Sequence, residues 1–147
     1  MSKETAVLLT VLVGGLIALQ APINSVLGKR IGTLPAASVS FAIGTTLLIA
    51  LAFTVGGGFG RLGETRHLQW YYLTGGALGA AYVTCVLVTV RTLGAGAVVA
   101  ATIAGQLTTA VVIDQLGILG LEKNAVTAPR LAGIVLLAAG TFLVVRY

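Results

Sequence analysis

The stretch LPAASVSFAIGTTLLIALAFTV, residues 34–55, decides the fold, because it contains no charged side chain from one end to the other. At about 1.5 Å of rise per helical residue, it is long enough to cross the ~30 Å hydrocarbon core of a bilayer. Four other apolar stretches follow, at residues 5–28, 69–90, 94–116 and 131–145, and Asp114 is the only charged side chain in them. The sequence therefore predicts five membrane-spanning segments.

The composition favours a membrane protein and argues against a soluble one. Only 9% of the 147 residues are charged and 57% are hydrophobic, with a mean hydropathy of +1.04, whereas soluble domains carry about 25% charged residues. Helices satisfy every backbone polar group within lipid, and the alternating segments of a β-barrel are absent from the sequence. We expect an all-α integral membrane protein with a single transmembrane domain, residues 1–147.

The first stretch has one alternative interpretation, a cleaved signal peptide. Its charged flank is only Lys3 and Glu4, it continues past Pro22, and it has no clear small-residue cleavage site. It also resembles the four later stretches. We therefore interpret it as a retained span.

The basic residues are divided almost evenly between the two sides of the membrane. Five spans place on one side Lys3, Arg61, Arg66, Lys123 and Arg130, and on the other Lys29, Arg30, Arg91 and Arg146. Membrane orientation is set mainly by an excess of Lys and Arg in short cytoplasmic loops, so this balance predicts insertion in both orientations. Two oppositely inserted copies form the inverted pair typical of secondary transporters, and we expect an antiparallel homodimer.

Two amides in the first span are candidates for binding a substrate. Gln20 and Asn24 lie four residues apart and share one helix face. Pro22 between them has no N–H and crowds the carbonyl of Ala18, so we expect a kink. Polar groups of this kind inside lipid must face protein, water or substrate. The alternative is that Gln20 and Asn24 only hydrogen-bond neighbouring helices.

The fourth span carries a polar stripe and an acid. Gln106 continues a line of hydroxyl residues along this helix, and Asp114 is the only acidic residue inside any predicted span. A carboxyl group there can exchange a proton for a cationic substrate, which predicts proton coupling. The alternative is a position near headgroup water, or an ion pair with Lys123 or Arg130.

Three other features have structural and functional interpretations. Tyr82, in mid-span, can hydrogen-bond a substrate or another helix, and Arg91 is expected to reach the membrane interface, with an anion anchor as the alternative. Glycines at helix-packing spacing predict close contacts between helices or between copies, the fifth span being the candidate contact between copies; they are Gly75, Gly79, Gly133 and Gly140.

Other classes of protein find little support. No Ser/His/Asp or Cys/His arrangement and no metal cluster is present, and the single Cys85 excludes an intrachain disulfide. The G-x-G-x-x-G pattern at residues 58–63 lies in a loop between spans and is a chance match. We therefore expect no enzyme activity and no cofactor. Basic residues scattered singly or in pairs indicate contact with lipid headgroups rather than nucleic acid.

Several motifs resemble the YdcZ-type family of inner-membrane exporters, a branch of the drug/metabolite transporter superfamily. The motifs are QAPIN at 20–24, SFAIGT at 40–45, GGALGAAY at 75–82, GQL at 105–107 and IDQLG at 113–117. The resemblance implies five spans, arranged in dual-topology proteins, oppositely oriented pairs or fused repeats. Small multidrug resistance relatives rely on a glutamate in the first span. That helix here carries Gln20 and Asn24, so their cation/proton mechanism is not implied.

These observations predict a transporter in the bacterial cytoplasmic membrane. A cavity near the midplane would be lined by Gln20, Asn24, Gln106 and Tyr82, with Asp114 coupling movement to protons. The expected cargo is a small polar or amphipathic metabolite or a drug-like cation. Two alternatives are one half of a heterodimer with an oppositely oriented paralogue, and a non-transporting assembly or regulatory subunit.

Overall fold

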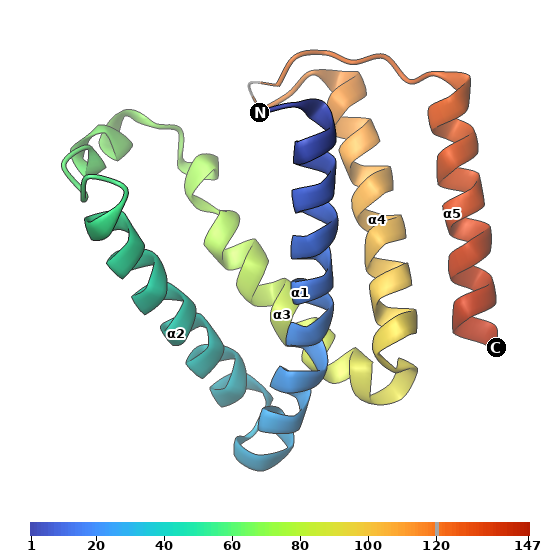
Figure 1. Ribbon diagram of the computed structural model, residues 1–147, viewed down its shortest axis with the longest axis horizontal. Coiled ribbons are helices and arrows are strands. Elements are labelled where there is room, and N and C mark those ends of the chain that lie inside the picture. Colours follow the sequence, from blue (N-terminus) through green and yellow to red (C-terminus); the bar gives the residue numbers. More distant parts are fainter. Residues whose placement is uncertain (120) are drawn as a thin grey trace. The chain divides into compact units, whose positions relative to one another are not determined.

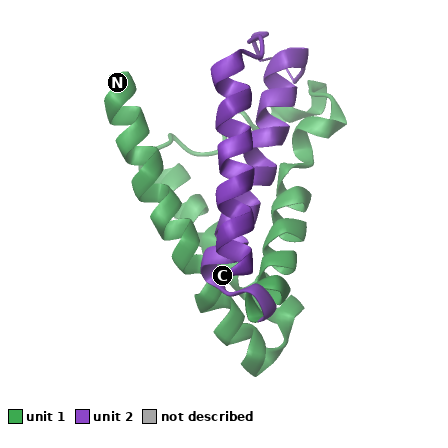
Figure 2. Cartoon of the chain, turned by 90° about the vertical axis from the view of Figure 1, so that its right-hand side faces the viewer, with its two compact units in different colours: residues 1–91 green, residues 92–147 purple. Residues whose placement is uncertain are grey.

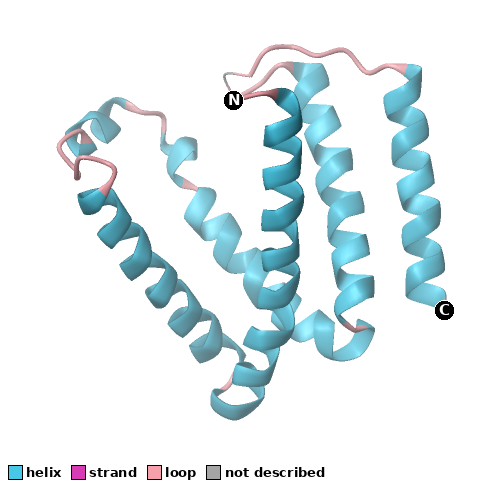
Figure 3. Cartoon of the chain, in the orientation of Figure 1, coloured by secondary structure: helices cyan, strands magenta, loops and turns pink. Residues whose placement is uncertain are grey.

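Five long helices make up most of the chain in the computed structural model, which describes residues 1–119 and 121–147 (Figure 1, Figure 3). All five are long and apolar enough to cross a membrane, which confirms the predicted all-helical class. The α-helices are α1 (Lys3–Ile31), α2 (Thr33–Thr54), α3 (Gly75–Leu93), α4 (Ala95–Leu116) and α5 (Ala128–Arg146). Two 3₁₀-helices, η1 (Leu62–His67) and η2 (Trp70–Leu73), lie between α2 and α3.

The start of α3 differs from the predicted stretch at 69–90, because the helix begins only at Gly75. The aromatic residues before it form the separate helix η2, and the Thr74 hydroxyl donates a hydrogen bond of 2.7 Å to the Tyr71 carbonyl oxygen at its end. Thr74 separates η2 from α3, and the first two residues of α3 are Gly75 and Gly76. The aromatic residues therefore precede the spanning helix instead of opening it.

The chain divides into two compact units, Met1–Arg91 and Thr92–Tyr147 (Figure 2). Unit 1 contains α1, α2 and all of α3 up to Arg91, and unit 2 contains α4 and α5. Each unit is built around one antiparallel pair of helices, α1 with α2 and α4 with α5.

In unit 1 the turn between α1 and α2 is a single residue, Gly32. Its φ of 95° lies in the region that L side chains rarely adopt, so glycine is needed there. The Gly32 N–H donates to the Gly28 carbonyl at 3.0 Å, and the Ala36 N–H donates to the Gly32 carbonyl at 3.1 Å. Pro35 follows in the first turn of α2, where a missing N–H costs nothing. The two helices therefore fold back on each other with no loop.

This turn fixes the register of the two helices. Gly28 and Ala36 each lie four residues from Gly32, and a Cβ built on Gly28 would lie 3.7 Å from the Ala36 Cβ. Asn24 and Ser40 each lie eight residues from Gly32, and their side chains are hydrogen-bonded. The contact surface is made of small residues, as is typical of helices that pack closely in membranes.

The core of unit 1 lies where α3 meets this helix pair. Ala36 and Leu87 are both 0% exposed, and Ala37, Val83 and Leu27 pack around them. Lipid is as apolar as these side chains, so the helices gain from this core mainly by van der Waals packing.

Replacing Leu87 with alanine is expected to lower the free energy of unfolding by about 2 kcal/mol. This is the lower end of the range for buried leucine truncations, because the cavity remains while the gain from leaving water is small in lipid. Leu78 on the same helix is 68% exposed, and Leu78→Ala should change stability by less than about 0.5 kcal/mol. Equilibrium unfolding in detergent micelles measures both, and equal losses would contradict the core assignment.

In unit 2 one hydrogen bond joins α5 to α4, and another joins α4 to the connection that precedes α5. The Thr141 hydroxyl of α5 donates a hydrogen bond of 3.1 Å to the Ala100 carbonyl oxygen of α4. Gly117 ends α4 with a φ of 61°, and its N–H donates to the Ile113 carbonyl at 2.9 Å. Beyond it, the Gln115 side-chain oxygen accepts a hydrogen bond of 2.7 Å from the Val126 N–H. These contacts hold the connection against the end of α4.

Candidate functional site

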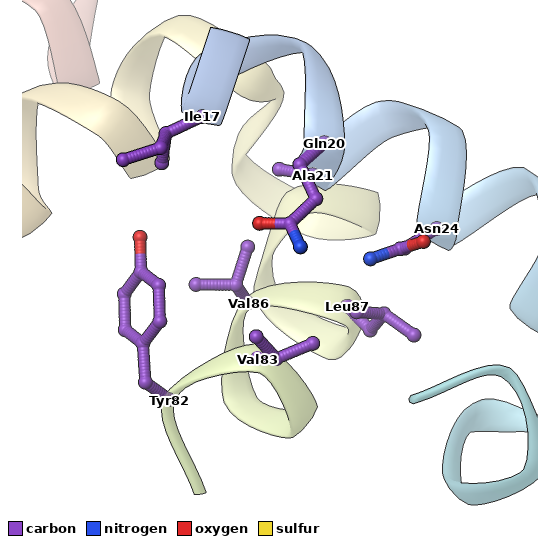
Figure 4. A pocket seen from close by; sticks show the side chains of 8 residues that line it. All are labelled: Ile17, Gln20, Ala21, Asn24, Tyr82, Val83, Val86 and Leu87. Carbon is purple, nitrogen blue, oxygen red and sulfur yellow. The ribbon is translucent and has the colours of Figure 1, made fainter. Parts of the chain in front are cut away.

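Three of the predicted site residues line one small pocket in unit 1. Gln20 and Asn24 face it from α1, and Tyr82 faces it from α3. Figure 4 shows the Gln20 amide between the Tyr82 ring and the Asn24 amide, above the apolar residues Val83 and Leu87. Its volume is about 10 Å³, which is room for about one water molecule. The two amides therefore lie at one pocket, and Tyr82 shares it.

Gln20 also lines a second, larger pocket, between α1 and α2. This pocket has a volume of about 200 Å³ and is lined by Gln20, Ser40, Phe41, Gly44, Thr45 and Leu48. Its polar side chains are an amide and two hydroxyls, which can donate and accept hydrogen bonds but carry no charge. Gln20 is exposed and is positioned to interact with the contents of either pocket.

Asn24 is held more firmly than Gln20. It is only 5% exposed, and its amide nitrogen donates a hydrogen bond of 3.1 Å to the Ser40 hydroxyl. The bond joins α1 to α2, as expected for the helix-packing interpretation of this residue. Within unit 1, Asn24 therefore joins the two helices, while Gln20 is exposed.

The Asn24–Ser40 bond should contribute a coupling energy of about 0.6 kcal/mol, the average for hydrogen bonds between membrane helices. A double-mutant cycle of Asn24→Ala and Ser40→Ala, read by unfolding in micelles, measures this energy. Ser38 serves as the matched control, because its hydroxyl donates to the Leu34 carbonyl of its own helix. Additive effects for Asn24 and Ser40 would rule out a stabilising bond.

Asp114 forms an ion pair with Arg130 in unit 2. The Arg130 Nη1 and the Asp114 Oδ2 are 3.3 Å apart, and each side chain is 35% exposed. The pair borders a pocket of about 290 Å³ whose other walls are Leu107, Ala110, Val111 and Gly133. The alternative interpretation of Asp114 is an ion pair with Lys123 or Arg130, and the structure shows the contact with Arg130. The pair is therefore half-buried beside an apolar pocket.

Other predicted residues take simpler positions. Gln106 is exposed on α4 in unit 2, and α1 continues through Pro22 as one helix from Lys3 to Ile31. A Cβ built on Gly79 would lie 3.6 Å from the Phe41 ring of α2, so this glycine meets an aromatic side chain. The remaining packing glycines have open space where a Cβ would point: Gly75, Gly133 and Gly140.

Two residues that line a pocket in unit 1 were not predicted as site residues. Ser40 and Thr45 belong to the SFAIGT motif, which by itself assigns them no role, and both line the pocket beside Gln20. The signal that identifies Ser40 is its symmetry with Asn24 about Gly32. A glycine alone between two spans fixes which residues face each other, so the register could have been read from the sequence.

A comparison with family models supports the membrane fold with an independent match. The model described as "Putative inner membrane exporter, YdcZ" matches residues 5–143, nearly the whole chain. A search of curated proteins found no match, and a search of solved structures also found none. Together with the five apolar helices, the match identifies a multi-pass inner-membrane protein. The chain belongs to the YdcZ family of inner-membrane exporters.

Proposed function

We propose that this chain is a secondary-active exporter of a small polar or amphipathic metabolite or a drug-like cation, working by alternating access in a dual-topology dimer. The observation that carries the proposal is the position of Gln20, which lines one pocket between α1 and α3 and another between α1 and α2. A free amide at such a depth is costly unless it serves a ligand, water or another helix. Substrate sites of secondary transporters lie near the midplane.

The size of these pockets favours a site completed by a second copy. Ligand pockets usually enclose about 300–1,000 Å³, while the two pockets at Gln20 measure about 10 and 200 Å³. Along α5, which is described throughout, no residue is buried, and Gly133 and Gly140 have no side chain within 4 Å of an added Cβ. A helix with such an open small-residue stripe supports α5 as the contact between copies.

Proton coupling is assigned to Asp114 in this proposal, with Arg130 as its partner in the resting state. When the carboxylate takes up a proton, its attraction for Arg130 is lost and the pair at 3.3 Å loses its electrostatic basis. A cationic substrate would compete with both the proton and Arg130 for the same carboxylate. Because the Asp114 carboxylate accepts only one positive charge at a time, binding of a cation on one side and of a proton on the other would exchange the two across the membrane.

Two other functions would use the same fold. The chain would be an obligate half of a heterodimer if it were fixed in one orientation and paired with an oppositely oriented paralogue. It would be a non-transporting assembly or regulatory subunit if Gln20 and Asn24 served only to join helices. Asn24 is hydrogen-bonded to Ser40, which favours helix joining as the role of Asn24. This bond says nothing about the role of Gln20.

Reporters fused after Tyr147, one active only inside the cell and one only outside, should both give signal. The expectation follows from the five-to-four division of Lys and Arg between the two sides, which sets no clear orientation. Removing Lys29 and Arg30 together should shift the signal strongly to one side, which controls for reporter sensitivity. Signal on one side only in the unmodified chain would replace the homodimer by the heterodimer.

A further inference from the structure

One end of unit 1 is strongly basic and carries no acid. Lys29 and Arg30 occupy the last turn of α1, and Arg91 lies near the end of α3 beside the start of α2. The two acids of unit 1 are elsewhere, Glu4 in the first turn of α1 and Glu64 beyond the far end of α2. Among the described residues, one ion pair is found, between Asp114 and Arg130 in unit 2. The three cations therefore have no acidic partner.

Two contacts at the α1–α2 turn hold Arg91 in place. Its Nη2 donates a hydrogen bond of 3.3 Å to the Thr33 hydroxyl. The guanidinium also lies over Gly28, because a Cβ built on Gly28 would come within 2.7 Å of the same nitrogen. A guanidinium has five N–H donors, and this bond uses one of them. Arg91 is therefore oriented, exposed and still able to bind an anion.

The surroundings of these cations are apolar and exposed. Ile31 is 45% exposed and Leu34 is 67% exposed, and these two residues flank Gly32 and Thr33 at the turn. A ligand that fits both features has an anionic group for the cations and hydrocarbon for these side chains. Free phosphate satisfies only the first of the two.

We propose that Arg91, Lys29 and Arg30 bind the phosphate group of an anionic phospholipid at the α1–α2 turn. Arginine matches phosphate with paired hydrogen bonds, and lysine adds a point charge. Basic pockets at the ends of membrane helices are suited to such headgroups. Gly28 is a positioning residue, because its missing side chain makes the space in which the Arg91 guanidinium lies.

The role of Gly28 gives a test that changes no charge. In Gly28→Ala the nearest atom to the new Cβ is the end of the flexible Arg91 side chain, while Leu87 and Ala36 stay at 3.5 and 3.7 Å, which are ordinary contacts. The arginine should move and the helices should not. The full chain, purified in a mild detergent, is incubated with phosphatidylglycerol or phosphatidylcholine, and bound lipid is counted by native mass spectrometry.

The expected result is binding of phosphatidylglycerol over phosphatidylcholine, with affinity reduced about fivefold in both Gly28→Ala and Arg91→Gln. That factor corresponds to about 1 kcal/mol for one basic residue near an anionic surface. Arg146→Gln removes an equal charge from the end of another spanning helix and should leave the affinity unchanged. Arg91→Lys, which keeps the charge but loses the paired geometry, should fall between the parent and Arg91→Gln.

Three results would overturn the proposal. In the first, Gly28→Ala binds phosphatidylglycerol as tightly as the parent chain. In the second, Arg146→Gln loses as much affinity as Arg91→Gln, so lipid binding depends only on the total charge of the chain. Inorganic phosphate at millimolar concentration could displace the lipid, which would assign the cations to a soluble anion. The elution volume and thermal unfolding of each variant, compared with the parent chain, show that the fold is kept.

Discussion

Asp114→Asn will abolish the stimulation of transport by a pH gradient while leaving assembly of the protein intact. The asparagine has nearly the same shape, so the half-exposed site at the end of α4 can keep its packing. It cannot take up or release a proton, and it removes the charge for which a cation competes. Proteoliposomes loaded with a panel of organic cations that includes ethidium measure the effect. For the compound with the highest parent flux, the ratio of flux with and without the gradient should fall to about one.

Two matched variants separate coupling from structure at this site. Glu122→Gln neutralises an acid outside the spanning helices and should keep the full response to the gradient. Arg130→Gln removes the partner of Asp114 but keeps the carboxyl group, so the response should persist. If Arg130→Gln and Asp114→Asn lose assembly equally, the pair is a structural tie between α4 and α5, and the proposed coupling role is wrong.

Gln20→Ala will reduce flux of the same compound about tenfold with unchanged assembly. Tenfold corresponds to about 1.4 kcal/mol, within the range for losing a hydrogen bond to a buried ligand group. Thr10 is the matched control on the same helix, because its hydroxyl is exposed and donates to the Ala6 carbonyl of α1 itself. Thr10→Ala should transport at the parent rate.

The Gln20 variant also distinguishes the transporter from the non-transporting subunit. If the amide joins helices, Gln20→Ala loses assembly and thermal stability together with any activity. If it binds substrate, only transport and ligand-induced stabilisation are lost. Comparison with Asn24→Ala is informative here, since Asn24 is already engaged with Ser40 and should show the stability loss that Gln20 does not.

The five helices could be predicted from the sequence because hydropathy is a local property. A run such as residues 34–55 is apolar whatever its neighbours are, and lipid requires it to be helical. The start of α3 at Gly75 could not be predicted in this way. The residues Trp70–Leu73 are apolar like those of the spanning helix, but they form a separate 3₁₀-helix. Hydropathy reports which residues tolerate lipid and carries little information on where a helix begins.

Contacts between helices were predicted only where spacing along one helix was enough. Gln20 and Asn24 share a face because they are four residues apart, and the structure places both at one pocket. The placement of Arg91 over Gly28 required knowing that α3 approaches the end of α1, which no local pattern encodes. Asp114 had two candidate cations, Lys123 and Arg130, and sequence distance would have favoured the nearer Lys123, whereas the structure pairs Asp114 with Arg130.

The one-residue link at Gly32 also constrains how the chain enters the membrane. Because α1 and α2 have no loop between them, neither can insert and wait for the other, and the two must enter the bilayer together as a helical hairpin. The tip of that hairpin carries Lys29 and Arg30, so α1 and α2 reach their orientation together. The basic residues of the later connections would then act on this hairpin as one unit, because a copy that turns over has to turn both helices together.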